Sequence, residues 1–300
     1  MTTMLPEGHP HAWKAEHADE HLDPGFRRQY MATGSTLVLT PALRQLINGV
    51  ATDLESDVPE DSTTRVGTER VAGRRSGLCT VVSGPWGAGK STLLQALIAV
   101  ADVNTVQVEI PESANAPAAQ WAVLTTALTG TASGTARAMQ CAALDYLTVV
   151  PTLLVVDEAQ HLTHAALRQL RWLWSARLPR FAIVLAGSNL DAHIAKDQSV
   201  ATRVNRRIAV KRLGTDRMLD LLRRSNPDLA ATPRELLAQI EEAYGHGSWR
   251  NWSELILKAT LEFGHTGPLT FETVADVVYD RTGLPLAVTG AGSRDTRRGR

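Results

Sequence analysis

A short run near position 90 brings together glycines, a lysine and hydroxyl residues, a combination suited to holding phosphate. The run reads Gly84, Pro85, Trp86, Gly87, Ala88, Gly89, Lys90, Ser91 and Thr92. Glycines let a backbone wrap closely around an anion, so that successive N–H groups and a helix start point at it. A lysine after the last glycine can reach the β- and γ-phosphates, and the next hydroxyl can bind Mg²⁺. The spacing GxxxxGK[ST] therefore predicts an ATP-binding loop in which Ser91 is a ligand of Mg²⁺.

Two acids end a second apolar run further along the chain. The run LLVV is followed directly by Asp157 and Glu158. Carboxylates at the tip of a buried strand are costly unless a positive charge lies near them. We expect Asp157 to hold the Mg²⁺, directly or through water, and Glu158 to orient and polarise the attacking water.

A polar pair follows a third apolar run, FAIVLAG. The pair is Ser188 and Asn189. We expect Asn189, or failing that Ser188, to hold the attacking water in line with the γ-phosphate. An ordinary turn at the end of a strand would use the same residue types, so this prediction is weaker than the first two.

Phosphoryl transfer places negative charge on the equatorial oxygens of the phosphate, and the positive charge of an arginine can stabilise it. Arg203 precedes the last predicted strand, with Arg206 and Arg207 close behind it, and Arg250 opens a helix near the C-terminus. Spacing alone does not decide which of the first three acts at a nucleotide, because most arginines are solvated surface residues.

The elements that must position these residues alternate between strands and helices. Strands are predicted at residues 78–83, 105–110, 152–156, 181–186 and 207–210, and helices at 91–101, 118–128, 134–147 and 163–176. Continuous apolar strands separated by helices imply a parallel sheet that is covered on both faces. Right-handed crossovers then make the fold a doubly wound α/β sheet.

The remaining segments suggest four regions. Residues 1–35 form a polar arm, and residues 36–213 form the α/β core, with a helix at 40–54 and an exposed loop at about 56–76. Residues 214–282 form a small helical domain, with helices at 216–224, 233–243, 248–263 and 271–279. Residues 283–300 form a basic tail that we expect to be disordered.

Composition excludes several classes of protein. The 300 residues are 44% hydrophobic and 21% charged, with zero formal net charge, as in an ordinary soluble chain. No apolar run is long enough for a membrane span and the start lacks an apolar signal core, so we expect a cytoplasmic protein. Cys79 and Cys141 are too far apart to suggest a disulfide framework or a metal site, and we expect His17 and His21 to be solvated.

Several phrases together carry a resemblance to a known family. They are GPWGAGKST, VVDEAQHLTHAALRQLRWL, a strand ending in AGSN, ATRVNRRIAVKRL and GHGSWRNWSELI. With them, the region from about residue 40 to residue 263 resembles the AAA+ ATPases that regulate DNA transposition, of the TniB, TnsC and phage Mu B type. It is also similar to the related secretion-associated ATPase ExeA.

This resemblance implies a P-loop NTPase of the AAA+ fold whose C-terminal helices form a lid. It implies Asn189 or Ser188 as the polar sensor, Arg203 as a finger that acts on a neighbour's ATP, and Arg250 as a sensor from the lid. It also implies an ATP-dependent homo-oligomer, a ring or filament, on double-stranded DNA. The partner would then be a DDE transposase.

The residues themselves give thinner support for DNA. Basic groups stand on the helix after the second motif, around the last strand and in the tail: Arg168, Arg171 and Arg177; Arg206, Arg207, Lys211 and Arg212; and Arg294, Arg297, Arg298 and Arg300. They could contact phosphates without reading bases, or be solvated helix faces. An alternative is a nucleotide-switched scaffold for protein partners without DNA. A small-molecule kinase is disfavoured, because Glu158 favours water as the nucleophile.

Overall fold

The computed structural model describes residues 45–46, 50, 78–101, 103–175 and 181–286. They fall into two compact units, one holding residues 78–86 and 90–211 and the other residues 87–89 and 212–286. The predicted arm, most of the helix at 40–54, the loop at 56–76 and the tail beyond residue 286 lie outside the described residues. Among the helices that the structure describes, none combines the length and the apolar character that crossing a membrane requires.

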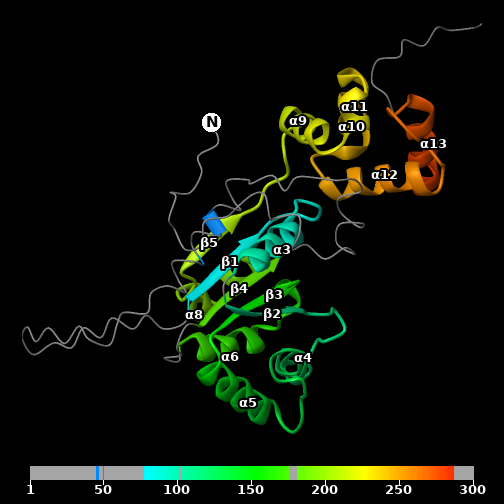
Figure 1. The fold of residues 1–300 in the computed structure, drawn as a ribbon. Coiled ribbons are helices and arrows are strands. Elements are labelled where there is room, and N and C mark those ends of the chain that lie inside the picture. Colours follow the sequence, from blue (N-terminus) through cyan, green and yellow to red (C-terminus); the bar gives the residue numbers. More distant parts are fainter. Residues whose placement is uncertain (1–44, 47–49, 51–77, 102, 176–180, 287–300) are drawn as a thin grey trace, which may run out of the picture. The chain divides into compact units, whose positions relative to one another are not determined.

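A five-stranded parallel sheet forms the centre of the first unit (Figure 1). Its strands are β1 (Leu78–Ser83), β2 (Asn104–Glu109), β3 (Thr152–Asp157), β4 (Phe181–Gly187) and β5 (Arg206–Ala209). Their order across the sheet is β2-β3-β4-β1-β5. The prediction of a parallel α/β sheet is confirmed, and each predicted strand is present within a residue at either end.

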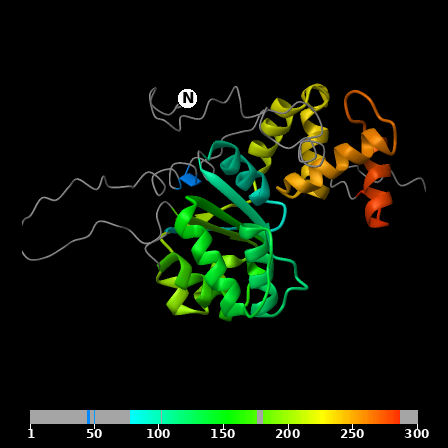
Figure 2. The ribbon, with the colours of Figure 1, turned by 60° about the horizontal axis from the view of Figure 1, so that its bottom comes forward.

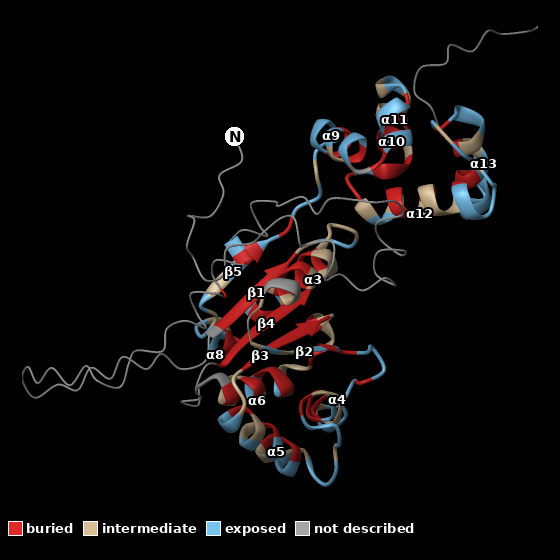
Figure 3. Cartoon of the chain, viewed as in Figure 1, coloured by how far each residue is buried: buried red, intermediate tan, exposed pale blue. Residues whose placement is uncertain are grey.

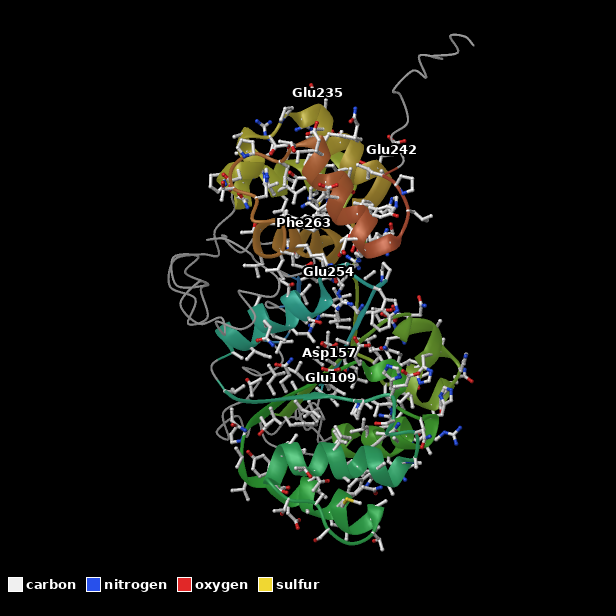
Figure 4. All side chains as sticks on the ribbon, turned by 90° about the vertical axis from the view of Figure 1, so that its right-hand side faces the viewer. Glu109, Asp157, Glu235, Glu242, Glu254 and Phe263 are labelled. Atoms are coloured by element: carbon white, nitrogen blue, oxygen red, sulfur yellow. The ribbon has the colours of Figure 1, made fainter. Side chains whose placement is uncertain are left out.

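Helices cover both faces of this sheet. They are α3 (Lys90–Val100), α4 (Pro117–Thr129), α5 (Ala136–Val149) and α6 (His164–Ser175), with a short turn η2 (Ala159–His161) before α6. Helix α3 lies on one face, α4 and α6 lie on the other, and α5 packs on α4 (Figures 1, 2 and 4). Two short helices, α7 (Leu190–Ala195) and α8 (Gln198–Ala201), were not predicted, because such short segments show no helical period.

Burial explains why the strands read as continuous apolar runs. Every residue of β3 and β4 is buried, and these two central strands are drawn in the colour of buried residues in Figure 3. Alternate side chains such as Leu154 and Ile183 pack into one core with α4 and α6. Since successive side chains point to opposite faces, Leu153 and Val184 face the side that α3 covers. A strand buried on both faces needs apolar residues at every position.

The second unit is helical. It comprises α9 (Thr215–Ser225), α10 (Pro227–Ala231), α11 (Arg234–Ile240), α12 (Trp249–Leu261) and α13 (Phe271–Thr282). Its core includes Met218, Leu222, Leu237, Trp252 and Val274. In Figure 4 the α12 residue Glu254 is labelled; it forms an ion pair with Arg281 of α13.

The single helix predicted at residues 233–243 is α-helical only from residue 234 to residue 240. The α-helix ends at Ile240, and a π-helical turn, Glu241–Gly245, follows it. Glu241 is 3% exposed and accepts hydrogen bonds from Trp252 Nε1 at 2.6 Å and from the Gly247 N–H at 2.5 Å. These two contacts hold the wide turn against α12, and a sequence pattern does not reveal such long-range partners.

Candidate nucleotide-binding site

The phosphate-binding loop joins the end of β1 to the start of α3. The Gly84 N–H donates to the Gly187 carbonyl at 3.3 Å, which ties the start of the loop to the end of β4. Gly89 has φ +92, in the left-handed region, and a Cβ there would meet no atom within 4 Å. Glycine is therefore required at this position by backbone conformation rather than by crowding. Pro85 and Trp86 are exposed, whereas Ala88 and Thr92 are half-buried.

The ammonium of Lys90 is folded back into this loop. Its Nζ donates to Gly84 O, Pro85 O and Ser188 Oγ, each at 3.1 Å, and Lys90 is only 6% exposed. The ring centroid of Trp86 lies 5.8 Å from Nζ. The loop therefore already carries a positive charge among backbone groups, as an anion-binding loop requires.

Ser91, at the start of α3, contacts Asp157, at the end of β3. Ser91 Oγ donates to Asp157 Oδ2 at 3.1 Å, and Asp157 Oδ1 accepts from the Glu158 N–H at 2.9 Å. Burial raises the pKa of Asp157, and the hydrogen bonds from Glu158 and Ser91 work against that rise. Glu109, opposite Asp157 in the register of β2 and β3, adds an exposed acid at this edge (Figure 4).

These oxygen donors fit Mg²⁺. A carboxylate beside a hydroxyl is a donor set that this ion prefers, and a nearby cation would offset the burial that raises the Asp157 pKa. Ser91 and Asp157 are the residues that would hold it. When bound, Mg²⁺ neutralises negative charge on the β- and γ-phosphates of a nucleotide.

Glu158 stands immediately after β3 with an unusual backbone. Its φ is +51, and its side chain is 19% exposed. The carboxylate accepts a hydrogen bond from Gln160 Nε2, and His161 Nε2 lies 4.0 Å from Oε2. The Gln160 contact was not predicted, although Gln160 belongs to the phrase DEAQHL, which was noted only for its resemblance.

At the end of β4, the structure brings Ser188 and not Asn189 to Lys90. Ser188 is 6% exposed, and its hydroxyl accepts from Lys90 Nζ. Asn189 is exposed, has φ +51 and starts α7 without a side-chain capping bond. The structure therefore brings Ser188, the alternative in the sequence prediction, to Lys90, and which of the two residues is the sensor stays a prediction.

The arginines differ in their partners. Arg207 pairs with Asp191 at 2.6 Å and donates to the Ala201 carbonyl at 3.2 Å. Arg206 is half-buried, whereas Arg203 is exposed and its side chain makes no hydrogen bond or ion pair with any described residue. Arg250 is exposed on the first turn of α12 in the second unit, and its role as a lid sensor stays a prediction.

The basic group on α6 is partly neutralised. Arg168 pairs with the buried Asp197, which precedes α8. The Nε of Arg171 is buried and has no hydrogen-bond partner in the described part of the chain. Arg177 and the arginines of the tail lie outside the described residues.

A parallel sheet with a phosphate-binding loop after β1 and two acids at the end of β3 is the arrangement of a P-loop NTPase, and this chain has the AAA+ fold. Residues 74–193 match the family model of the AAA domain. No curated protein sequence matches the chain.

Solved structures share this fold at low sequence identity. The chain is similar to the ORC2 protein of Aeropyrum pernix, solved in ADPNP–ADP complexes, with a TM-score of 0.59, 16% identity and coverage of 85% of this chain and 72% of that one. The ORC1 protein of the same organism, solved in complex with DNA, gives a TM-score of 0.58, 15% identity and coverage of 81% and 66%. A Walker-type ATPase of Pyrococcus abyssi gives a TM-score of 0.51 and 15% identity, with coverage of 68% of this chain and 67% of that one.

Proposed function

We propose that this protein is an ATPase that binds ATP with Mg²⁺ and hydrolyses it to ADP and phosphate. One observation carries the proposal: Lys90, Ser91 and Asp157 meet beside Glu158 where β1, β3 and β4 end. A cation, a hydroxyl–carboxylate pair and a second carboxylate are the groups that phosphoryl transfer to water requires.

Each side chain has a distinct task in this reaction. Lys90 exchanges its loop carbonyls for the β- and γ-phosphate oxygens, which are stronger acceptors because they are charged. Glu158 accepts the proton of the attacking water as the new O–P bond forms and the bond to ADP breaks. Ser188, whose hydroxyl accepts a hydrogen bond from Lys90 Nζ, is our candidate for the polar sensor of the γ-phosphate.

Two substitutions test the ATPase proposal. Lys90→Ala should weaken ATP binding by about 100-fold, because it removes a charged donor to the phosphates. Glu158→Gln should bind ATP normally and hydrolyse it at least about 100-fold more slowly. The matched control is Lys196→Ala, which replaces an exposed lysine between α7 and α8. It should change neither ATP binding nor ATP hydrolysis. Tight ATP binding by Lys90→Ala would contradict the proposal.

We further propose that the protein assembles as a homo-oligomer on double-stranded DNA, with Arg203 reaching a neighbour's ATP. The guanidinium of Arg203, which is exposed and has no partner among the described residues, and the DNA complex of the ORC1 neighbour support this. The ion pairs of Arg168 and Arg207 weigh against those two residues as phosphate contacts. A DDE transposase as the partner, and a cytoplasmic location, rest on the resemblance and the composition of the chain.

Steady-state ATP hydrolysis with and without long double-stranded DNA tests this second proposal. Stimulation that fades as salt rises is expected, because phosphate contacts release counterions. Hydrolysis that is indifferent to DNA would favour the alternative, a nucleotide-switched scaffold for protein partners. Co-purification of a DDE transposase in the presence of ATP would support the partner assignment, and its failure to co-purify with or without ATP would contradict it.

A further inference from the structure

Gln160 lies in the turn η2, and its side-chain amide bonds in two directions. Its Oε1 accepts from the Ser188 N–H at 2.9 Å, and its Nε2 donates to Glu158 Oε2. A backbone N–H only donates and a carboxylate only accepts, so these partners fix which end of the amide faces each of them. The amide therefore bridges the end of β4 to the carboxylate of Glu158.

The last residue of β4 is shaped for this bridge. A Cβ at Gly187 would lie 2.2 Å from Gln160 Oε1, 3.1 Å from the backbone nitrogen of Gln160 and 3.3 Å from that of Ala159. Gly187 is not among the residues with positive φ, so its backbone conformation does not demand glycine. The close approach of η2, and above all of the Gln160 side-chain oxygen, accounts for the missing side chain.

The bridge also connects Glu158 to Lys90. Ser188 accepts from Lys90 Nζ on its hydroxyl and donates to Gln160 through its N–H. Glu158 leaves β3 with φ +51, and its side chain has several rotatable bonds. A hydrogen bond from Gln160 restricts those bonds and sets where the carboxylate stands relative to the end of β4.

We propose that Gln160 is a positioning residue for ATP hydrolysis, holding the Glu158 carboxylate in place relative to Ser188 and Lys90. The inference rests on the ATPase function proposed above. Gln160 acts through Glu158, so its loss should slow the chemical step and leave ATP binding unchanged.

Gln160→Met removes both hydrogen bonds at nearly constant size. We expect kcat to fall by about 10- to 100-fold, since a small displacement of a catalytic group is enough for that, while the Kd of ATP changes by less than about 2-fold. The matched control is Gln169→Met on α6. Gln169 Oε1 accepts from Trp121 Nε1 at 2.6 Å, so this control also loses a hydrogen bond and should lower Tm without changing kcat.

A double-mutant cycle separates positioning from general stability. In a Glu158→Gln background, adding Gln160→Met should cost no further activity in single-turnover hydrolysis, because the carboxylate that it positions is gone. An equal loss in both backgrounds would overturn the proposal, and so would wild-type kcat in Gln160→Met alone.

Gly187→Ala is an independent variant if Gln160→Met does not fold. Its Cβ displaces the side-chain amide while Gln160 is retained, so kcat should fall as in Gln160→Met; a normal kcat would overturn the proposal.

The ATPase proposal and the proposal for Gln160 are contradicted by different results. Normal turnover by Glu158→Gln would contradict the assignment of the water-activating base, whereas normal turnover by Gln160→Met alone would contradict only the role of Gln160.

Discussion

Two neighbouring residues at the end of β4 have opposite surroundings. The hydroxyl of Ser188 is buried against Lys90, whereas the side chain of Asn189 is exposed at the start of α7. Adjacent residues at a strand end point in different directions, so which one reaches the site depends on where the strand stops. Residue type alone favours the Asn189 amide as the polar sensor, whereas the contact with Lys90 favours the Ser188 hydroxyl.

Ser188→Ala should therefore lower kcat for ATP hydrolysis by about 10-fold, the effect of losing one polar contact near the transferred phosphate. Asn189→Gly, which keeps the left-handed backbone without strain, should stay within about 2-fold of the wild type. Steady-state phosphate release measures both. A larger loss in Asn189→Gly than in Ser188→Ala would identify Asn189 as the sensor.

The residues of the loop and the acids after β3 were predictable because their spacing is set by local geometry. A loop between a strand and a helix places Lys90 and Ser91 without any knowledge of distant residues. Gln160 was not predictable in this way. Its contact with Ser188 depends on the 3-10 turn after Glu158, which folds the side chain back to β4.

At the scale of elements, the buried strands were predicted well and the short helices were not. A strand such as β3 is apolar throughout because both of its faces are covered. Helix α8 has no apolar period to detect, and its start is fixed by Asp197, whose carboxylate accepts from the Ser199 N–H at 3.0 Å and from Ser199 Oγ at 2.6 Å.

The charge of Asp197 should contribute to stability in a pH-dependent way. Hydrogen bonds from Ser199 and Arg168 lower its pKa from 3.8 to about 2. Its contribution is therefore complete above pH 3.8 and is lost as the pH falls toward about 2. Asp197→Asn keeps a capping oxygen and removes the charge, so Tm at pH 7 should fall by about 2 °C.

Thermal unfolding at pH 7, 4 and 3 checks this expectation. The difference in Tm between wild type and Asp197→Asn should shrink between pH 4 and pH 3. Asp191→Asn is the control, because its pair with Arg207 joins half-exposed side chains and should matter less. A difference in Tm that persists unchanged at pH 3 would mean that the carboxylate charge is not its source.

At the scale of the whole molecule, the parallel sheet separates Arg203 from the phosphate-binding loop of its own chain. The Asn205 N–H donates to the Cys79 carbonyl at 2.9 Å, so Arg203 lies near the amino-terminal ends of β1 and β5. Lys90 follows the carboxyl-terminal end of β1, and the strand from Cys79 to Gly84 rises by about 17 Å. An arginine side chain does not span this distance, so our proposal that Arg203 acts on ATP requires the ATP of another subunit.

Mixing two inactive variants tests this arrangement. Arg203→Ala and Glu158→Gln should each bind ATP but hydrolyse it poorly when alone. In a head-to-tail oligomer, the ATP site of an Arg203→Ala subunit regains its arginine whenever its neighbour is a Glu158→Gln subunit. Random mixing in equal amounts makes about a quarter of the sites complete, so the mixture should recover up to about 25% of wild-type hydrolysis.

Arg207→Ala is the control in the same assay. Its guanidinium is already engaged by Asp191, so this variant should retain most of its hydrolysis when it is assayed alone. If the mixture of Arg203→Ala and Glu158→Gln recovers nothing while both variants still oligomerise with ATP, Arg203 does not act between subunits. Loss of hydrolysis in Arg207→Ala, with recovery on mixing with Glu158→Gln, would instead identify Arg207 as the finger. The geometry favours Arg203 over Arg207 as the finger, because Arg207 would have to leave its ion pair with Asp191 before it could bind a neighbour's phosphate.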